Sequence, residues 1–106
     1  MILLNLTPHD VNIITDGGVT TYTKGGTPPR LKQDNIPTGE VICGTLITKA
    51  VFGKTTNLPP LEKDTFLIVS RMVQEGNLSR TDLLSPNELV RDEKGRIVGC
   101  KSLSRI

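Results

Sequence analysis

The residues of this chain best suited to chemistry are hydroxyl, basic and acidic side chains that alternate in its last third. They fall in four groups: Ser70-Arg71, Ser79-Arg80-Thr81-Asp82, Arg91-Asp92 and Lys101-Ser102. An arginine guanidinium presents a fork of donors that suits a phosphate or carboxylate, and hydroxyls add neutral donors. These residue types suit a small anionic ligand that bears sugar hydroxyls. Composition alone favours the alternative interpretation, which is a solvated surface with ordinary ion pairs.

Catalytic groups are scarce, because the chain has a single histidine, His9. A nucleophile–histidine–acid arrangement stays open, since serine, threonine and aspartate are abundant. However, no Gly-x-Ser-x-Gly sequence or other local nucleophile signature is present. A lone histidine beside a proline turn is more often a hydrogen-bonding residue that fixes the local backbone. The sequence therefore predicts no catalytic residues.

Signals for cofactors and metals are also weak. No Gly-x-x-x-x-Gly-Lys or Gly-x-Gly-x-x-Gly occurs, and turn formation explains Gly17-Gly18 and Gly25-Gly26. The two cysteines, Cys43 and Cys100, are far apart in sequence and are expected to be reduced, partly buried thiols. A four-ligand metal site needs more histidine or cysteine than this chain has. We therefore expect neither a cofactor nor a metal.

The composition narrows the class of partner. A formal net charge of +2 is too small to indicate a nucleic-acid or membrane surface. The aromatics are Tyr22, Phe52 and Phe66, too few for stacking along a single-stranded nucleic acid. Phe66 is expected in the core, and Phe52, next to Gly53, is the better candidate for an exposed ring. No apolar run approaches ~20 residues, and the N-terminus lacks the charged start of a signal peptide. We expect a cytoplasmic protein that does not enter a membrane.

The chain length and turn signals predict one β-rich domain over residues 1–106. Strands are expected at 2–7 (ending at Pro8 or lying at a sheet edge), 11–15, 19–23, 40–52 (with a bulge or a bend at Gly44) and 65–70 (central and buried on both faces). Residues 88–91 and 96–102 are expected to form a hairpin around Asp92-Glu93-Lys94-Gly95. Residues 70–77 predict a short helix capped by Ser70 and stopped at Gly76, with Met72 and Val73 on its apolar side. Residues 24–37 predict a loop, either functional or a poorly ordered connector, and residues 80–86 an irregular segment.

These elements predict a mainly β fold with one short helix (α+β), built as a small antiparallel sheet or a partly open β-barrel. A monomer of this size has difficulty enclosing a ligand. If the chain binds a ligand tightly, we therefore expect an interface pocket in a homo-oligomer.

Two segments of the chain resemble a family of small proteins of bacteriophages and prophages. Asn5-Leu6-Thr7-Pro8-His9-Asp10-Val11 resembles the family's opening, and Leu89-Val90-Arg91-Asp92-Glu93-Lys94-Gly95-Arg96-Ile97-Val98-Gly99-Cys100-Lys101-Ser102-Leu103 resembles its ending. Shorter stretches between them keep the family's order and spacing: Asn57-Leu58-Pro59, Leu67-Ile68-Val69-Ser70 and Arg80-Thr81-Asp82-Leu83-Leu84. The resemblance covers most of the chain except about residues 20–40, and its two end motifs are the specific ones.

The resemblance implies a phage-related origin, and with it action in the host cytoplasm. Small phage proteins of this size often counter host defence, and one class acts as a sponge that sequesters a nucleotide-derived immune signal of cyclic dinucleotide or ADP-ribose type. In that reading Arg71, Arg80, Arg91 and Lys101 are candidate phosphate contacts. The candidate contacts to ribose hydroxyls and base edges are Asn5, Thr7, His9, Ser70 and Asp82.

Two other readings stay open. The chain is alternatively a phage structural or accessory module whose strand edges pair with another protein. A third reading is a nucleotide-cleaving enzyme that uses His9.

Overall fold

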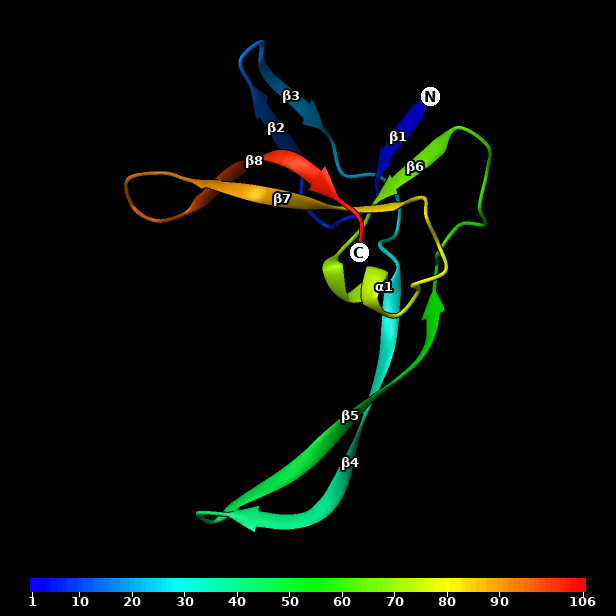
Figure 1. Ribbon diagram of the computed structural model, residues 1–106, viewed down its shortest axis with the longest axis vertical. Helices are drawn as coiled ribbons and strands as arrows, with labels where there is room; N and C mark the ends of the chain where they lie inside the picture. The colour runs from blue at the N-terminus through cyan, green and yellow to red at the C-terminus, as the bar shows by residue number, and fades with distance from the viewer.

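The computed structural model describes residues 1–106 and has 57% of them in strands and 5% in one helix. The elements in chain order are β1 (Ile2–Asn5), β2 (Val11–Thr15), β3 (Gly18–Tyr22), β4 (Arg30–Ile42), β5 (Thr45–Thr56), β6 (Thr65–Ile68), α1 (Arg71–Glu75), β7 (Leu83–Arg91) and β8 (Ile97–Ser104). Figure 1 shows a body that holds α1 and six of the strands, with the β4–β5 hairpin projecting from it.

The body is a six-stranded sheet in the order β1-β6-β7-β8-β2-β3, curled into a half-barrel. The β7–β8 and β2–β3 pairs are antiparallel, whereas β1–β6 and β6–β7 are parallel. β2 meets β8 through a single parallel pair, Ile13 with Cys100. The predicted mainly β fold with one short helix is confirmed, and β1 lies at a sheet edge as expected. The parallel pairings add a feature that the sequence did not indicate.

The core of the body is small. Only 12 of the 106 residues are buried, and the apolar ones form two clusters. Leu67, Val69, Val73 and Leu83 make one cluster; Val11, Ile68 and Cys100 make the other. Three of these residues belong to the run after Thr65, which lies between β1 and β7. The predicted central strand is therefore confirmed, although β6 ends at Ile68.

Helix α1 begins and ends where the sequence indicated. The Ser70 hydroxyl accepts a hydrogen bond from the backbone N–H of Val73, and Gly76 follows the last turn. Of the two residues predicted for its apolar side, Val73 is buried but Met72 is 47% exposed, and Gln74 is buried in addition. The Gln74 amide donates to the carbonyl oxygens of Leu83 and Ser104 and so ties the helix to β7 and to the end of β8. None of this helical structure is long or apolar enough to cross a membrane.

The predicted hairpin of β7 and β8 is present, and the predicted strands β2 and β3 form a second one. β2 and β3 flank the Asp16-Gly17 turn, and Gly95 has the positive φ (79°) that the β7–β8 connection requires. The expectation that residues 80–86 are irregular is wrong from Leu83 onward, because β7 begins there. Pro86, the last residue of the segment expected to be irregular, is itself a strand residue of β7 and pairs with Leu103 of β8.

The β4–β5 hairpin, here called the arm, corrects two predictions. Residues 30–37 are strand rather than loop, and the predicted strand 40–52 is split by a turn at Cys43-Gly44. Both turn residues have positive φ, 51° and 75°, as a two-residue hairpin requires, so of the two alternatives for Gly44 the chain bends there, in a hairpin turn, and has no bulge at this residue. Because the arm is exposed on both faces, its strands lack the apolar alternation that identifies a half-buried strand.

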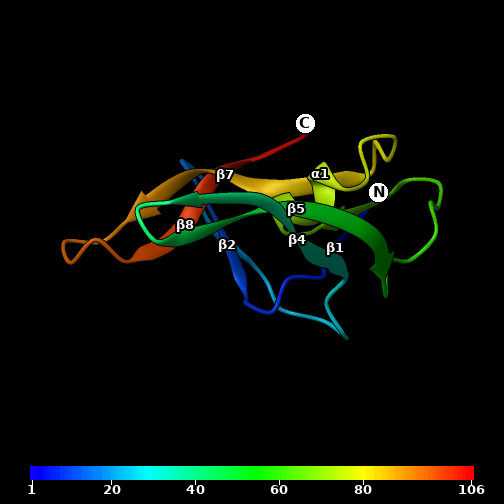
Figure 2. The ribbon, with the colours of Figure 1, turned by 90° about the horizontal axis from the view of Figure 1, so that it is seen from below.

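The arm gives the molecule an extended, thin shape. The principal extents are 53 × 39 × 22 Å, and the view from below shows the shallow dimension (Figure 2). The radius of gyration is 16.8 Å, whereas a compact domain of this length has about 13 Å. Cys43 is exposed at the tip of the arm, against the expectation of two partly buried thiols; Cys100 is buried, and both are free.

Gly99 permits β2 to approach β8. A Cβ at this position would lie 2.8 Å from the Asn12 carbonyl oxygen and 2.7 Å from Ile14 Cδ1, so the backbone of β2 would have to move. We expect Gly99→Ala to lower the free energy of unfolding by roughly 1–3 kcal/mol, as overpacking does. Denaturant unfolding measures the change. Gly17→Ala is the matched control, since its Cβ meets nothing closer than 3.8 Å; an equal loss in both variants would contradict the role of close strand approach.

Candidate functional site

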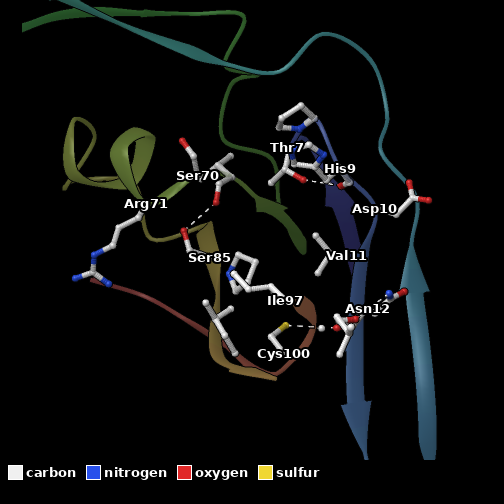
Figure 3. A pocket seen from close by; sticks show the side chains of 16 residues that line it. Thr7, His9, Asp10, Val11, Asn12, Ser70, Arg71, Ser85, Ile97 and Cys100 are labelled. Atoms are coloured by element: carbon white, nitrogen blue, oxygen red, sulfur yellow. Dashed lines mark hydrogen bonds between the residues drawn. The ribbon is translucent and has the colours of Figure 1, made fainter. Parts of the chain in front are cut away.

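A hollow of the body with a volume of about 760 Å³ lies between β2, β7, β8 and the start of α1 (Figure 3). Its apolar lining comes mainly from Val11, Val69, Pro86, Leu89, Ile97 and Val98. Its polar lining comes from Thr7, His9, Asp10, Asn12, Ser70, Arg71 and Ser85. A mostly apolar concavity with a few polar groups is the usual composition of a small-molecule site, and the volume lies in the usual range.

The Asn5 side chain positions the segment that carries Thr7 and His9. Its amide nitrogen donates to the carbonyl oxygens of His9 and Tyr22, both at 2.8 Å. Its amide oxygen accepts from the backbone N–H of Thr7 at 2.9 Å and from the Thr7 hydroxyl at 2.6 Å. Asn5 is buried and does not belong to the lining of the hollow, so the structure gives it a positioning role.

His9 is exposed, and its imidazole makes no hydrogen bond in the structure. The backbone carbonyl of His9 accepts from Asn5 and lies 2.8 Å from the Thr7 hydroxyl oxygen, whose one proton can be donated either to this carbonyl or to the Asn5 amide oxygen. The expectation of a residue that fixes the local backbone therefore fits Asn5, whose side chain does this, and not His9. The imidazole is left free to face a ligand from the side of the hollow opposite Arg71 (Figure 3).

Arg71 is the one cation in the lining of the hollow. Its Nε donates to Glu75 at 3.3 Å across one turn of α1, with both side chains more than half exposed. Such an exposed pair is weak, and it leaves both terminal guanidinium nitrogens without a partner. Beside it, Ser70 keeps a hydroxyl proton to donate, because its oxygen is the acceptor in the helix cap.

The other three basic candidates lie elsewhere. The Arg80 guanidinium donates through two nitrogens to the Asp82 carboxylate, both at 2.8 Å, and also to the Pro59 carbonyl. Arg91 donates to the Gly95 carbonyl at the β7–β8 turn, and Lys101 is exposed on β8 outside the hollow. The structure brings together Thr7, His9, Ser70 and Arg71, and it does not gather the four cations around one hollow in a single chain.

The Arg80–Asp82 pair is part of the fold. Asp82 is 3% exposed, and the hydrogen bonds from Arg80 lower the pKa of its carboxyl and raise the pKa of the guanidinium. The two residues fix the connection between α1 and β7 against the chain near Pro59. Asp82 is therefore unavailable for ribose hydroxyls in this arrangement.

Several lining residues were not among the sequence candidates. Asp10, Asn12 and Ser85 are hydrogen-bonded to other segments of the chain: the Asp10 carboxylate accepts from the Lys24 N–H, the Asn12 amide donates to the Val98 carbonyl, and the Ser85 hydroxyl donates to the Val69 carbonyl. The sequence candidates also lacked the apolar lining residues, such as Leu89 and Val98. These two share a strand face with Cys100 on the predicted hairpin. Strand alternation in that hairpin is the signal that points to them.

No protein-family model, curated protein or solved structure matches this chain. No group of three or more histidine, cysteine or acidic side chains is placed to hold a metal ion. The site is therefore interpreted from its own geometry.

The Asn5 amide makes four hydrogen bonds in a buried setting, so its loss should be costly. We expect Asn5→Ala to lower the free energy of unfolding by about 3 kcal/mol, since net contributions are near 1 kcal/mol per bond and buried carbonyls lose their donors. Thermal or urea unfolding measures this. Asn87→Ala, at an exposed position of β7 without a side-chain hydrogen bond, should stay within about 0.5 kcal/mol of wild type. Equal effects at both positions would contradict the positioning role.

Asp82 should make stability depend on acid pH. Its folded-state pKa is below the ordinary value of 3.8, so its stabilisation is complete above that value and is lost as the pH falls through the folded pKa. We expect Asp82→Asn to be about 3 kcal/mol less stable at neutral pH, with the difference from wild type shrinking below about pH 4. Urea unfolding across this range measures it, with exposed Glu62→Gln as control. A difference that does not vary with pH would contradict the ion-pair origin.

Proposed function

We propose that this chain is a non-catalytic binding protein that sequesters a small anionic ligand in the hollow between β2, β7, β8 and α1. The observation that carries the proposal is the meeting of an apolar concavity of about 760 Å³ with the guanidinium of Arg71, whose terminal nitrogens are not used by its exposed pair with Glu75. Sequestration needs affinity alone, so no group has to be tuned for proton transfer or nucleophilic attack.

The ligand class that we propose is a nucleotide-derived signal of cyclic dinucleotide or ADP-ribose type. The resemblance of both chain ends to phage proteins supports this class, and so does the lining. Arg71 suits a phosphate, while Ser70, Thr7 and His9 offer hydroxyl and imidazole groups to ribose or a base edge. The apolar wall around Leu89 and Val98 suits the face of a base. In a phage this protein would keep a host immune signal from its receptor.

The arrangement around His9 favours binding over cleavage. The Thr7 hydroxyl already donates within the Asn5 network, and the Ser70 oxygen accepts in the helix cap. Neither hydroxyl is hydrogen-bonded to the imidazole, so no nucleophile–base pair is assembled. Nucleotide cleavage by His9 stays the less favoured alternative.

A second candidate function is a protein-interaction module. The arm favours it, because two long strands with free edges extend from the body and expose apolar side chains on both faces. Such edges can pair with strands of another protein. A ligand screen separates the two functions, since a pure interaction module is expected to bind none of the nucleotide-derived signals.

The decisive experiment is a thermal-shift screen with cyclic dinucleotides and ADP-ribose-type signals, followed by mass spectrometry of ligand released on heating. We expect at least one of these ligands to raise the Tm through linkage and to be recovered intact. Altered ligand would favour the enzyme, and a panel without any shift would contradict sequestration of this class.

Arg71→Gln should then weaken binding about tenfold or more, since a hydrogen bond to a charged group contributes about 1.5–3 kcal/mol. Arg91→Gln removes the same charge outside the hollow and is the matched control. Equal affinity of the Arg71 variant and wild type would remove Arg71 from the site.

A further inference from the structure

The charges that line the hollow cancel when the imidazole of His9 is neutral. Apart from His9, the lining residues that can carry a charge are Asp10, Arg71 and Cys100. The Cys100 thiol keeps its proton at neutral pH, because burial raises its pKa. The Asp10 carboxylate and the Arg71 guanidinium then contribute one charge of each sign. A phosphate-bearing ligand therefore meets a hollow without net positive charge unless His9 is protonated.

The imidazole of His9 is free to take up a proton and to present it to a ligand. His9 is exposed, and none of the three ion pairs of the structure includes it. The neighbouring Asp10 carboxylate accepts instead from the backbone N–H of Lys24, at 2.9 Å. A histidine changes its charge between about pH 5 and 8, and an imidazolium donates through both ring nitrogens. His9 can therefore become the second cation of the hollow.

His9 and Arg71 approach the hollow from opposite sides. His9 lies between β1 and β2, whereas Arg71 is the first residue of α1, and Figure 3 shows the two side chains across the hollow from each other. Glu75, which pairs with Arg71, and Lys24, which binds Asp10 through its backbone, are both outside the lining. Two anionic groups of one ligand can thus each meet a cation only if the groups are separated.

We propose that His9, as the imidazolium, is a second phosphate contact opposite Arg71, and that the hollow therefore takes a ligand with two separated phosphates. Of the two ligand types in the proposed function, on which this inference rests, a cyclic dinucleotide has this arrangement, since its two phosphodiesters lie across its ring from each other. The two phosphates of ADP-ribose share one bridging oxygen and present both charges at one place. The proposal moves His9 from a contact of ribose or a base edge to a phosphate contact.

The same contact makes binding depend on pH. A ligand that binds the imidazolium holds the proton on His9, so the affinity rises as the pH falls through the histidine range and decreases as the pH rises. The phosphodiesters of a cyclic dinucleotide stay ionised over this range, and the Arg71 guanidinium keeps its charge. The binding of such a ligand should therefore take up a fraction of a proton, and His9 is its source of pH dependence.

Titration calorimetry at about pH 6 and about pH 8 tests the ligand class with cyclic di-AMP, cyclic di-GMP and ADP-ribose. We expect a cyclic dinucleotide to bind about tenfold or more tightly than ADP-ribose at the lower pH, and its Kd to rise about fivefold or more at the higher pH. Equal binding of both ligand types, or tighter binding of ADP-ribose, would overturn the two-phosphate arrangement and leave sequestration standing. Absence of binding by all three at both pH values would contradict the proposed function itself, and this inference with it.

His9→Gln removes the titration and keeps a polar side chain. The imidazole makes no hydrogen bond in the structure, so the variant should fold like wild type, and its Tm without ligand checks this. We expect the variant to bind the cyclic dinucleotide equally at both pH values and to take up no proton. Lys101→Gln, outside the hollow, is the control and should keep the wild-type pH dependence.

A His9 variant that keeps the wild-type pH dependence would remove His9 from the phosphate contact. Calorimetry of the wild-type protein in two buffers of different ionisation enthalpy gives an answer even if the variant fails to fold, because it counts the protons taken up on binding. Binding of the cyclic dinucleotide without proton uptake would overturn the role of the imidazolium.

A double variant tests whether the two cations hold different phosphates. The effects of contacts without a shared partner multiply, whereas those of two contacts to one group do not. We expect the fold losses of affinity from His9→Gln and Arg71→Gln at about pH 6 to multiply when both are combined. A double variant hardly weaker than the more affected single variant would place both cations on one phosphate and overturn the separated arrangement.

Discussion

The curled sheet depends on one buried amide group. The sheet's two edge strands are β1 and β3, and Asn5 at the end of β1 donates to the carbonyl of Tyr22 at the end of β3. The backbone adds a second link there, from the Gly25 N–H to the Asn5 carbonyl. A single asparagine thus holds together the two edges of a half-barrel whose strand pairings alone leave it open. The same amide fixes the turn that presents Thr7 and His9, so the shape of the hollow follows from the closure of the sheet.

The small core sets the second constraint. With 12 buried residues, the body has little apolar area with which to offset the entropy of ordering its chain. Hydrogen bonds from polar side chains to backbone carbonyls supply part of the stabilisation that the small core does not provide. Gln74 ties α1 to two carbonyls, and Arg80 joins Asp82 to the carbonyl of Pro59. The arm adds residues that must be ordered but adds none to this core. It therefore lowers the stability of the fold unless its apolar faces are covered.

The parts of the fold that the sequence predicted are those with local signals. Asp16-Gly17 and the Asp92–Gly95 turn specify hairpins, and the continuous apolar run after Thr65 marks the central strand. Of the arm, residues 40–52 were predicted as strand without the turn at Cys43-Gly44, whereas residues 30–37 were missed because they are solvated on both faces and include Pro37, a residue type common in turns and loops. A proline is tolerated there, since β4 lies at an edge of a two-stranded sheet. The parallel pairings of β6 join segments far apart in sequence, for which no local pattern exists.

The candidate site, like the fold, was predictable from the sequence only where its residues are neighbours along the chain. Thr7 and His9 share one turn, and Ser70 and Arg71 are adjacent, so each pair stays together; the half-barrel then brings both pairs to one hollow. The other two candidate arginines, Arg80 and Arg91, had an equally suitable chemistry, but their side chains donate to backbone carbonyls outside the hollow. Arg105 likewise donates to the carbonyl of Thr81. Since Arg71 is the one permanent cation left at the hollow, charge alone distinguishes poorly among anions there. Selectivity must then come from the placement of Arg71 and His9 on opposite sides and from the shape of the apolar wall.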